Sequence, residues 1–249
     1  MLVKHYKDLD ELFLKLNQGF LENPDEYITY TQSIQGYNDN VLLTCESHKC
    51  SLDLGMFGYK SGKWPHLLRT YIDWEQLEQF KAKLSKASGM SLTYYFKQKQ
   101  VNNGSCLLNV VITRKKRKGP WTKINMNWRT SESQRRFAAD LVLVHHFINE
   151  LPECCQIDDI AFYFNQIYCS GMFINGYFDF FGIPRKGISK SKHPWHKSLM
   201  SNYERFFKTV DQIHSYKALQ RMQHLYFKIE KFPAIPIESL SIKDHFEKG

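Results

Sequence analysis

Hydrophobic and polar positions along the chain repeat with two different periods, which predict helices and strands. Residues 9–21 carry apolar side chains at three- and four-residue spacing, as an amphipathic helix does. Residues 71–88 show the same period and end at Gly89, so they predict a second helix. The apolar run at 136–151 leaves little polar surface, and we expect that helix to be buried.

Alternation of apolar and polar residues predicts strands between these helices. The segments 91–100 and 105–116 flank the turn at 101–104, and the segment 122–131 follows the Gly119-Pro120 turn. These three segments are therefore expected to form consecutive hairpins. Further strands are predicted at 27–34, 40–47, 159–170 and 232–242, and a mostly helical segment at 199–232.

Composition and charge narrow the class of protein. A chain of 249 residues that is 43% hydrophobic and 15% aromatic can bury a sizeable core, and no linker divides it, so we expect one α+β domain over 1–249. The formal net charge of +9 favours an anionic partner, either a nucleic acid or a phosphorylated small molecule. We find no apolar run long enough for a membrane and no signal peptide, so a soluble, cytoplasmic protein with free thiols is expected.

Two basic segments, 114–118 and 185–197, are candidates for nucleic-acid binding. The first lies between two predicted strands, where a solvated hairpin tip is the commoner explanation, so direct nucleic-acid binding is an alternative that we do not favour. Cys45, His48 and Cys50 have metal-binding chemistry. A fourth ligand is not evident and the spacing fits no standard zinc pattern, so we predict no metal site.

Cys106 is a candidate nucleophile because it opens a predicted strand directly after a glycine turn, where its side chain can be reached. Catalytic cysteines need access and a positive charge that stabilises the thiolate. Arg129, at the end of the next strand of the hairpin, is placed to supply that charge. A purely structural cysteine is the alternative explanation.

Asp140 stands at the start of the apolar run, where a carboxylate sits at the edge of a core. An unpaired carboxylate is costly there. Helix capping is one explanation, because aspartate is favoured at helix starts and complements the helix dipole. The other explanation is that Asp140 recognises a ligand.

These landmarks, in this order, resemble thymidylate synthase and its relatives, the pyrimidine-nucleotide hydroxymethylases. Cys106 heads a strand, Arg129 lies in the sequence WRTSE, and Asp140 stands where the family has an asparagine. Gln166 and Tyr168 match the spacing of the family's sugar-binding His-x-Tyr pair. The resemblance covers roughly residues 94–240 and implies a thymidylate synthase-like fold, a mixed sheet packed with helices, in a sheet-mediated homodimer.

The resemblance also implies the chemistry. Cys106 would add to C6 of a pyrimidine nucleoside monophosphate, and C5 would then take a one-carbon unit from 5,10-methylenetetrahydrofolate. Arg129 would hold the 5′-phosphate. The other implied roles are a hydroxyl donor from Thr130, sugar contacts from Gln166 and Tyr168, a folate contact from Glu132, a proton-managing carboxylate from Glu75, and basic residues Lys97 and Lys99 donated across the dimer.

Asp140 distinguishes the bases within this resemblance. An asparagine suits uracil, whereas a carboxyl group accepts from the cytosine amino group and shares a proton with N3. We therefore expect a deoxycytidylate hydroxymethylase, an activity that would suit a bacteriophage or nucleotide biosynthesis. The alternatives are a C5 methyltransferase or a relative that acts on uridylate, and a catalytically altered nucleotide- or nucleic-acid-binding protein. Departures from the family pattern are Ser105 for its proline, Thr130 for serine, Glu132 for aspartate, Arg136 for glycine and Gln166 for histidine.

Overall fold

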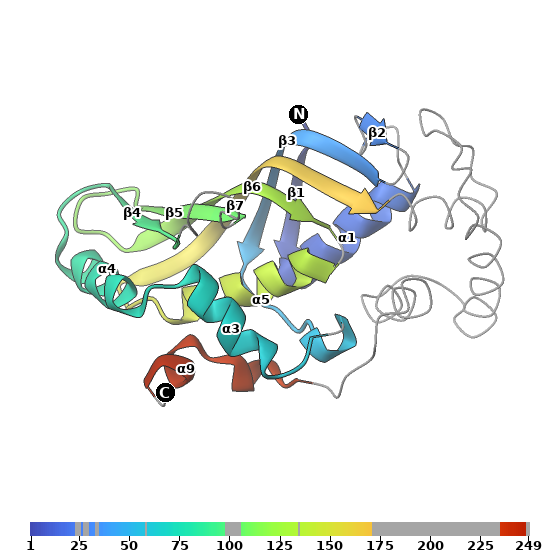
Figure 1. Cartoon of the computed structure of the whole chain (residues 1–249). Coiled ribbons are helices and arrows are strands. Elements are labelled where there is room, and N and C mark those ends of the chain that lie inside the picture. The colour runs from blue at the N-terminus through green and yellow to red at the C-terminus, as the bar shows by residue number, and fades with distance from the viewer. Residues whose placement is uncertain are drawn as a thin grey trace.

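The computed structural model describes residues 1–22, 26, 30–32, 35–57, 59–97, 106–133, 135–170 and 235–247. These residues form an α+β fold in which a mixed sheet packs against helices (Figure 1). The strands are β1 (Val3–Asp8), β2 (Tyr30–Gln32), β3 (Gln35–Ser47), β4 (Ser91–Tyr95), β5 (Leu107–Thr113), β6 (Trp121–Glu132) and β7 (Cys155–Ser170). The helices are α1 (Leu9–Glu22), α3 (Lys63–Tyr71), α4 (Trp74–Lys86), α5 (Arg135–Asn149) and α9 (Ile242–Glu247), with 3-10 turns at Leu54–Phe57 and Ile237–Leu240.

The described strands form one sheet in the order β1-β3-β7-β6-β5-β4, and β2 pairs with β3. The β1–β3 and β6–β7 pairs are parallel, and the other pairs are antiparallel. The predicted hairpins β4–β5 and β5–β6 are confirmed. The two long strands β6 and β7 lie side by side in the middle of the sheet. Each of them therefore has a hydrogen-bonded neighbour on both sides.

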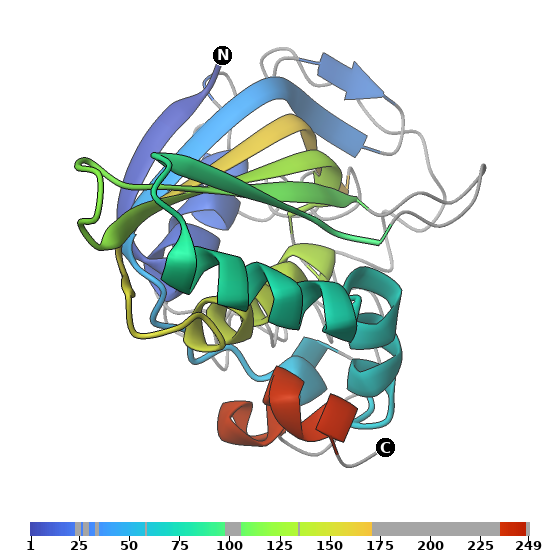
Figure 2. The same ribbon diagram turned by 90° about the vertical axis from the view of Figure 1, so that its left-hand side faces the viewer.

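All of the described helices lie on one side of the sheet (Figures 1 and 2). Alternate residues of β6, among them Met126 and Trp128, are buried on that side. Trp128 stacks on Phe162 and Phe164 of β7 with ring centroids 5.5 and 5.1 Å apart, and Phe137 of α5 meets Phe164 edge-on at 5.5 Å. The core therefore fixes α5 against β6 and β7.

The predicted helices 9–21 and 136–151 are confirmed as α1 and α5. The helix predicted at 71–88 is confirmed as α4, which begins later, at Trp74, because Tyr71 is the last residue of α3. Asp73 breaks the run: its backbone is extended and its carboxylate accepts the N–H of Gln76 at 3.1 Å, which starts a new helix.

The strand predicted at 232–242 is wrong for its described part, which forms the turn Ile237–Leu240 and the start of α9. This segment packs on helices instead of the sheet. The indole N–H of Trp64 donates to the carbonyl of Leu240 at 2.8 Å, and Trp74 stacks on Phe246 at 5.4 Å. The predicted helix at 199–232 and the basic loop at 185–197 lie outside the described residues.

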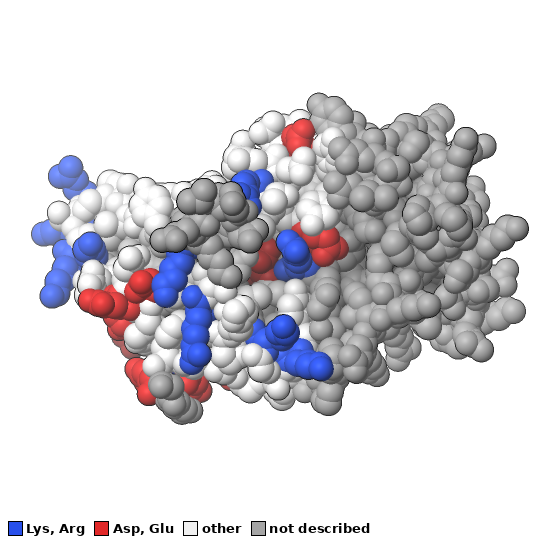
Figure 3. Space-filling model, viewed as in Figure 1, with Lys and Arg blue, Asp and Glu red and all other residues white. Residues whose placement is uncertain are grey.

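The basic run at 114–118 divides into two parts. Residues 115–118 form the exposed turn between β5 and β6, as predicted for a hairpin tip, and Figure 3 shows basic side chains gathered at that end of the molecule. Arg114 is instead 7% exposed. Its guanidinium donates to the carbonyls of Gly89, Ala87 and Gly119 at 2.8, 2.5 and 3.3 Å and lies 4.2 Å from the Trp121 ring.

Among the described residues, no helix combines the length and the apolar character that a bilayer crossing requires.

Replacing Arg114 with methionine is expected to destabilise the fold by roughly 2–4 kcal/mol, because three carbonyls lose a charged donor and the ring contact is lost. Urea unfolding followed by tryptophan fluorescence measures the change. Lys116→Met, in the exposed turn, is the matched control and should unfold with the wild type. Equal midpoints for all three proteins would contradict this structural role of Arg114.

Candidate functional site

A cavity of about 170 Å³ opens where the sheet, α5 and the α3 segment meet. The sheet side contributes Cys106 and Ser131, and α5 contributes a row of residues at helical spacing that includes Asp140. The third side is aromatic and apolar. The lining residues are Tyr59, Leu67, Tyr71, Cys106, Ser131, Arg136, Ala139 and Asp140. Two residues predicted from the sequence, the thiol and the carboxyl group, are thus brought into one cavity.

Cys106 directly precedes β5, and its carbonyl accepts the N–H of Arg129 in β6 at 2.8 Å. The predicted placement of Arg129 beside Cys106, across the hairpin, is therefore confirmed. The Arg129 guanidinium also interacts with the thiol by a hydrogen bond and by its charge. Cys106 is half-buried, so a small molecule that enters the cavity can reach its sulfur.

The expected thiolate at Cys106 is not the resting state. Burial raises the pKa of the Cys106 thiol above its ordinary value, and the nearby Asp140 carboxylate raises it further. The positive charges of Arg136 and Arg129 lower this pKa but do not outweigh burial. The charge of Arg129 thus favours the thiolate in the predicted direction, but burial is the larger effect, and the protonated thiol is favoured in the free protein.

Asp140 is 5% exposed and accepts a hydrogen bond from the Ser131 hydroxyl at 2.9 Å. Burial raises the pKa of Asp140 to about 7, although Ser131 and the Arg136 charge lower it. The indole N–H of Trp128 has no partner at hydrogen-bond geometry among the described residues, yet it is close enough to lower the same pKa. The carboxyl group therefore exchanges its proton near neutral pH.

Capping does not explain Asp140. The helix α5 begins at Arg135, so Asp140 lies in its second turn and bonds to no helix-start N–H. Glu132 caps the start of α5 instead, because its carboxylate accepts the N–H of Arg136 at 3.0 Å. The capping alternative is wrong, and the ligand explanation gains support from the position of Asp140 on the cavity wall.

Arg136 is a cavity residue that the sequence reasoning noted only as a departure from the family pattern. It lies one helical turn before Asp140, and its charge acts on Cys106, Glu132 and Tyr168. Among the described residues, its guanidinium makes no hydrogen bond or ion pair. The signal in the sequence was the spacing of Arg136, Ala139 and Asp140, which puts all three on one helix face.

Ser131 was also missed, because the family pattern pointed to Thr130 as the hydroxyl donor. Every second residue of β6 is buried up to Trp128, but the next buried residue is Ser131 and not Thr130. Thr130 is therefore only partly buried, and it does not line the cavity. Thr130 instead pairs with Gln166 of β7. The aromatic residues Tyr59 and Tyr71 carried no signal in the sequence.

The proposed sugar-binding residues lie on β7 next to the cavity. Gln166 donates to the Asp39 carboxylate at 3.3 Å, so its amide is engaged within the sheet. Tyr168 pairs with Glu132 across β6 and β7 and interacts electrostatically with Cys106. Burial raises the pKa of the Tyr168 phenol, and the Glu132 charge raises it too, so Tyr168 remains a neutral donor. Of the pair, Tyr168 is the residue near the thiol.

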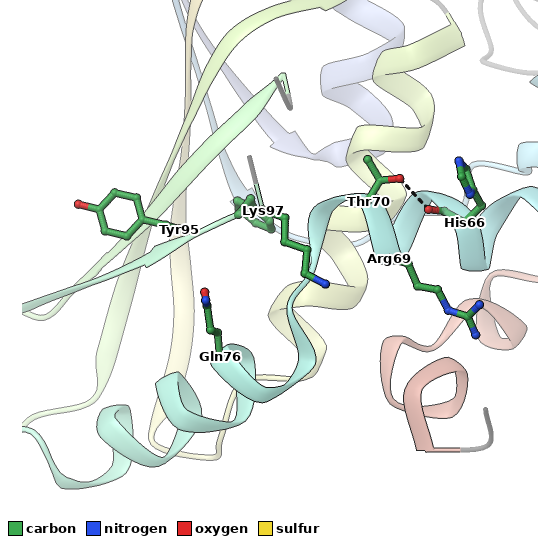
Figure 4. A pocket seen from close by; sticks show the side chains of 7 residues that line it. His66, Arg69, Thr70, Gln76, Tyr95 and Lys97 are labelled. Atoms are coloured by element: carbon green, nitrogen blue, oxygen red, sulfur yellow. Dashed lines mark hydrogen bonds between the residues drawn. The ribbon is translucent and has the colours of Figure 1, made fainter. Parts of the chain in front are cut away.

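Two other predicted residues, Glu75 and Lys97, do not line this cavity. Glu75 lies in the first turn of α4, where it accepts a hydrogen bond from Gln79 at 3.3 Å. Lys97 lies 3.9 Å from the Asp73 carboxylate and lines a second pocket of about 630 Å³ between α3, α4 and β4 (Figure 4). Lys99 lies outside the described residues. Donation of either lysine to a partner's site stays a prediction.

Cys45, His48 and Cys50 do not form a metal site in the structure. No group of three metal-ligating side chains occurs within the part of the chain that is described. Cys45 and Cys50 are buried, and His48 instead bonds to the Asn149 amide oxygen at 3.0 Å. The two cysteines therefore belong to the hydrophobic core, and His48 joins the segment after β3 to the end of α5.

Comparisons with protein-family models and with curated proteins return no match for this chain.

Asp140→Asn is expected to change how stability depends on pH. The folded-state pKa of about 7 exceeds the ordinary 3.8, so the stabilising effect of the proton is complete below about pH 4 and lost as pH rises through about 7. The variant should therefore gain roughly 1–4 kcal/mol over wild type between about pH 5 and pH 8. Urea unfolding at a series of pH values measures this.

Asp158→Asn, which removes an exposed carboxylate of β7, is the control for that series and should follow the wild type. Parallel pH profiles for wild type and Asp140→Asn would show that Asp140 titrates as an ordinary carboxylate.

Alkylation of Cys106 by iodoacetamide should be slow at neutral pH and still accelerating above about pH 9, because its thiol pKa is raised. Asp140→Asn should speed the reaction roughly 2- to 10-fold at about pH 8, since a negative charge beside the thiol is removed. Mass spectrometry of the Cys106 peptide gives the rate. A plateau already reached below neutral pH would contradict the protonated resting state.

Proposed function

We propose that the protein is a pyrimidine nucleotide C5 hydroxymethylase that acts on a cytosine nucleotide of the deoxycytidylate type. The observation that carries the proposal is the shared cavity of Cys106 and Asp140, a thiol and a buried carboxyl group that exchanges its proton near neutral pH. The cavity has the scale of a single ring and is smaller than the sites that enclose drug-sized ligands.

Asp140 supports cytosine over uracil. Its carboxyl group accepts a hydrogen bond from the exocyclic amino group of cytosine and, when protonated, donates to N3. Uracil would instead present an oxygen and an N–H in these positions: the ionised carboxylate has no proton to donate to O4 of uracil, whereas it accepts from the amino group of cytosine in either protonation state. Mismatched polar groups of this kind discriminate strongly in a buried site. Ser131 holds the second carboxyl oxygen, which fixes the orientation of the group.

The chemistry begins at Cys106. The thiol first loses its proton, and Arg129 and Arg136 stabilise the thiolate that forms. The thiolate adds to C6, the C5=C6 pair shifts to C4=C5, and the C4=N3 pair moves to N3, which takes a proton from Asp140. C5 is now nucleophilic. C5 would then bond to the methylene group of the one-carbon donor, and after loss of the C5 proton and departure of tetrahydrofolate, water would add to the exocyclic methylene to give the hydroxymethyl group. Return of the N3 proton to Asp140 and elimination of the Cys106 thiolate would restore the aromatic ring and the enzyme.

The one-carbon donor in this proposal is 5,10-methylenetetrahydrofolate. The interior of the cavity holds one ring, so a folate would lie at the mouth, against the half-buried rings of Tyr59 and Tyr71, which suit a flat heterocycle. When bound, it supplies an electrophilic methylene group. Glu132, expected to contact the folate, is already bonded to the start of α5.

A homodimer with shared active sites is part of the proposal. The described helices lie on one side of the sheet, and the described residues place no helix on the other side (Figures 1 and 2). That face carries Tyr95 and Tyr163, which are 65% and 37% exposed, among polar pairs such as Asn109 with Asn127. A second copy placed there would cover these rings, which is consistent with dimerisation through the sheet.

Two observations favour a second candidate, a nucleotide-binding protein that has lost the reaction. The Cys106 thiol is protonated at rest, and the amide of Gln166 is engaged by Asp39 instead of standing free for a sugar. Such a protein would bind the nucleotide without exchange of the C5 hydrogen. Isotope exchange therefore separates the two candidates.

With deoxycytidylate tritiated at C5 and methylenetetrahydrofolate, the protein is expected to release tritium to water. Cys106→Ala should abolish release, whereas Cys154→Ala, a half-buried thiol outside the cavity, should not. Asp140→Asn should move the preference toward deoxyuridylate by on the order of 100-fold, because an amide complements O4 and N3–H of uracil.

Release that persists in Cys106→Ala would exclude the covalent route. Release of tritium from deoxyuridylate alone would contradict the role of Asp140 in cytosine recognition. Nucleotide binding without any release would favour the second candidate.

A further inference from the structure

A groove lies between β4 and the helices α3 and α4, and among the described residues it shares no lining residue with the cavity of Cys106. It consists of two hollows of about 630 and 380 Å³, which adjoin because Gln76 and Tyr95 line both. Figure 4 shows the side chains around the larger hollow. The other residues that line this β4 groove include Arg69, Gln79, Lys83, Thr93 and Lys97.

The strand β4 presents an unpaired backbone edge at this groove. Among the described strands, β4 is the last in the sheet and pairs with β5 alone. The N–H of Phe96 donates to the carbonyl of Leu108 at 3.1 Å, so the even-numbered residues here direct their backbone groups toward β5. Their neighbours direct theirs to the opposite side. The outer edge therefore consists of backbone groups that no described residue bonds, those of Ser91, Thr93 and Tyr95.

The direction of this edge is confirmed just beyond the strand. The N–H of Lys97 donates to the carbonyl of Tyr71, the last residue of α3, at 2.8 Å. Lys97 is an even number of residues from Thr93, so both N–H groups point to the same side of the strand. The chain thus supplies one bond on the outer edge itself, and the unpaired groups begin at Tyr95.

The usual protections of an edge strand are absent from β4. Such strands commonly carry a proline, a charged residue or a bulge, which keeps other chains from pairing with them. The sequence of β4, SLTYY, has no proline and no charged residue, and its pairing with β5 is regular. The edge is therefore open to an added strand, and the amide of Gln76 on the facing wall offers that strand a donor and an acceptor.

The charge of the groove selects among possible strands. Arg69 and Lys97 line the larger hollow and Lys83 the smaller one, whereas no acidic residue is among the described residues that line either. The Asp73 carboxylate, 3.9 Å from Lys97, offsets part of this charge. A second copy of the chain would bring an identical basic surface to the edge, because two-fold pairing sets each groove against the other. The charge therefore favours an acidic strand over self-pairing.

We propose that the β4 groove binds an acidic segment of a partner protein, which joins the sheet as an added strand beside β4. The backbone of the segment pairs with Thr93 and Tyr95, and its carboxylates pair with the basic side chains of the two helices. Main-chain bonds supply affinity in complexes of this kind, and side-chain contacts supply specificity. This interaction surface does not depend on the function proposed for the cavity.

A fluorescein-labelled peptide of alternating glutamate and valine, followed by fluorescence anisotropy, tests the groove. The wild type should bind it and should not bind the same peptide with lysine in place of glutamate. Lys83→Glu should weaken binding at least about fivefold, since an attractive charge becomes repulsive. Arg117→Glu makes the same charge change in the exposed β5–β6 turn and should bind as the wild type does.

Thr93→Pro tests the backbone pairing, because it removes an outward N–H and should weaken binding at least about tenfold. It removes no bond to β5, so the sheet should be retained. Thr93→Ala keeps the N–H and is the matched control, with unchanged binding. Hydrogen exchange of the wild type gives a second measurement: the glutamate peptide should slow exchange of the Thr93 and Tyr95 amides.

Several results would overturn the proposal. These are no binding of the glutamate peptide, equal binding of the lysine peptide, or binding that neither slows amide exchange in β4 nor responds to Thr93→Pro. Tighter binding of a single-stranded oligothymidylate, weakened by Lys83→Glu and unaffected by Thr93→Pro, would replace the acidic strand with a nucleic acid. Self-association that Thr93→Pro abolishes, measured by sedimentation, would show that a second copy occupies the edge.

Discussion

A carboxyl group buried in the second turn of α5 is the constraint on which the site depends. Asp140 faces β6 with 5% exposure, and its partner is the Ser131 hydroxyl. Burying a carboxylate is costly unless it is hydrogen-bonded or protonated. Asp140 accepts the Ser131 hydrogen bond, and its raised pKa favours the protonated form. The aromatic packing of Trp128 and Phe137 around Phe164 keeps α5 against the sheet, so the carboxyl group cannot move out to solvent.

The same carboxyl group links the base-recognition part of the cavity to the nucleophile. Its charge raises the pKa of Cys106, while Arg136 and Arg129 lower it. In the proposed function this balance has a consequence: when Asp140 shares its proton with a cytosine ring, its charge and that of the thiol respond together to the bound ligand. A ligand that keeps the proton on Asp140 would remove this negative charge from beside the thiol, so the thiolate would be more favoured in the complex than in the free protein.

Sequence patterns predicted the parts of the fold that depend on local order. Period-two alternation found β5 and β6, and their hairpin turn placed Arg129 beside Cys106, because a hairpin's register follows from its turn. The apolar run predicted a buried α5. Asp73, which caps α4 and so sets its start at Trp74, was not recognised as a cap, because a polar residue inside an amphipathic period looks like part of the solvent face.

What the sequence could not supply were contacts between distant segments. Ser131 replaces Thr130 as the buried hydroxyl because the alternation along β6 changes near its end, which only the packing against α5 decides. The C-terminal segment packs on Trp64 across 176 positions, where extended-looking proline residues had suggested a strand. Tyr59 and Tyr71 reach the cavity through the placement of α3, for which no pattern in the sequence gave a signal.

The central claim is that Cys106 attacks a cytosine nucleotide held by Asp140, and trapping the covalent adduct tests it most directly. With 5-fluorodeoxycytidylate and methylenetetrahydrofolate, the fluorine at C5 cannot leave as a proton, so the adduct should persist. Mass spectrometry should find the nucleotide on the Cys106 peptide, in wild type but not in Cys106→Ser. An unmodified Cys106, or an adduct on any other cysteine, would contradict the account.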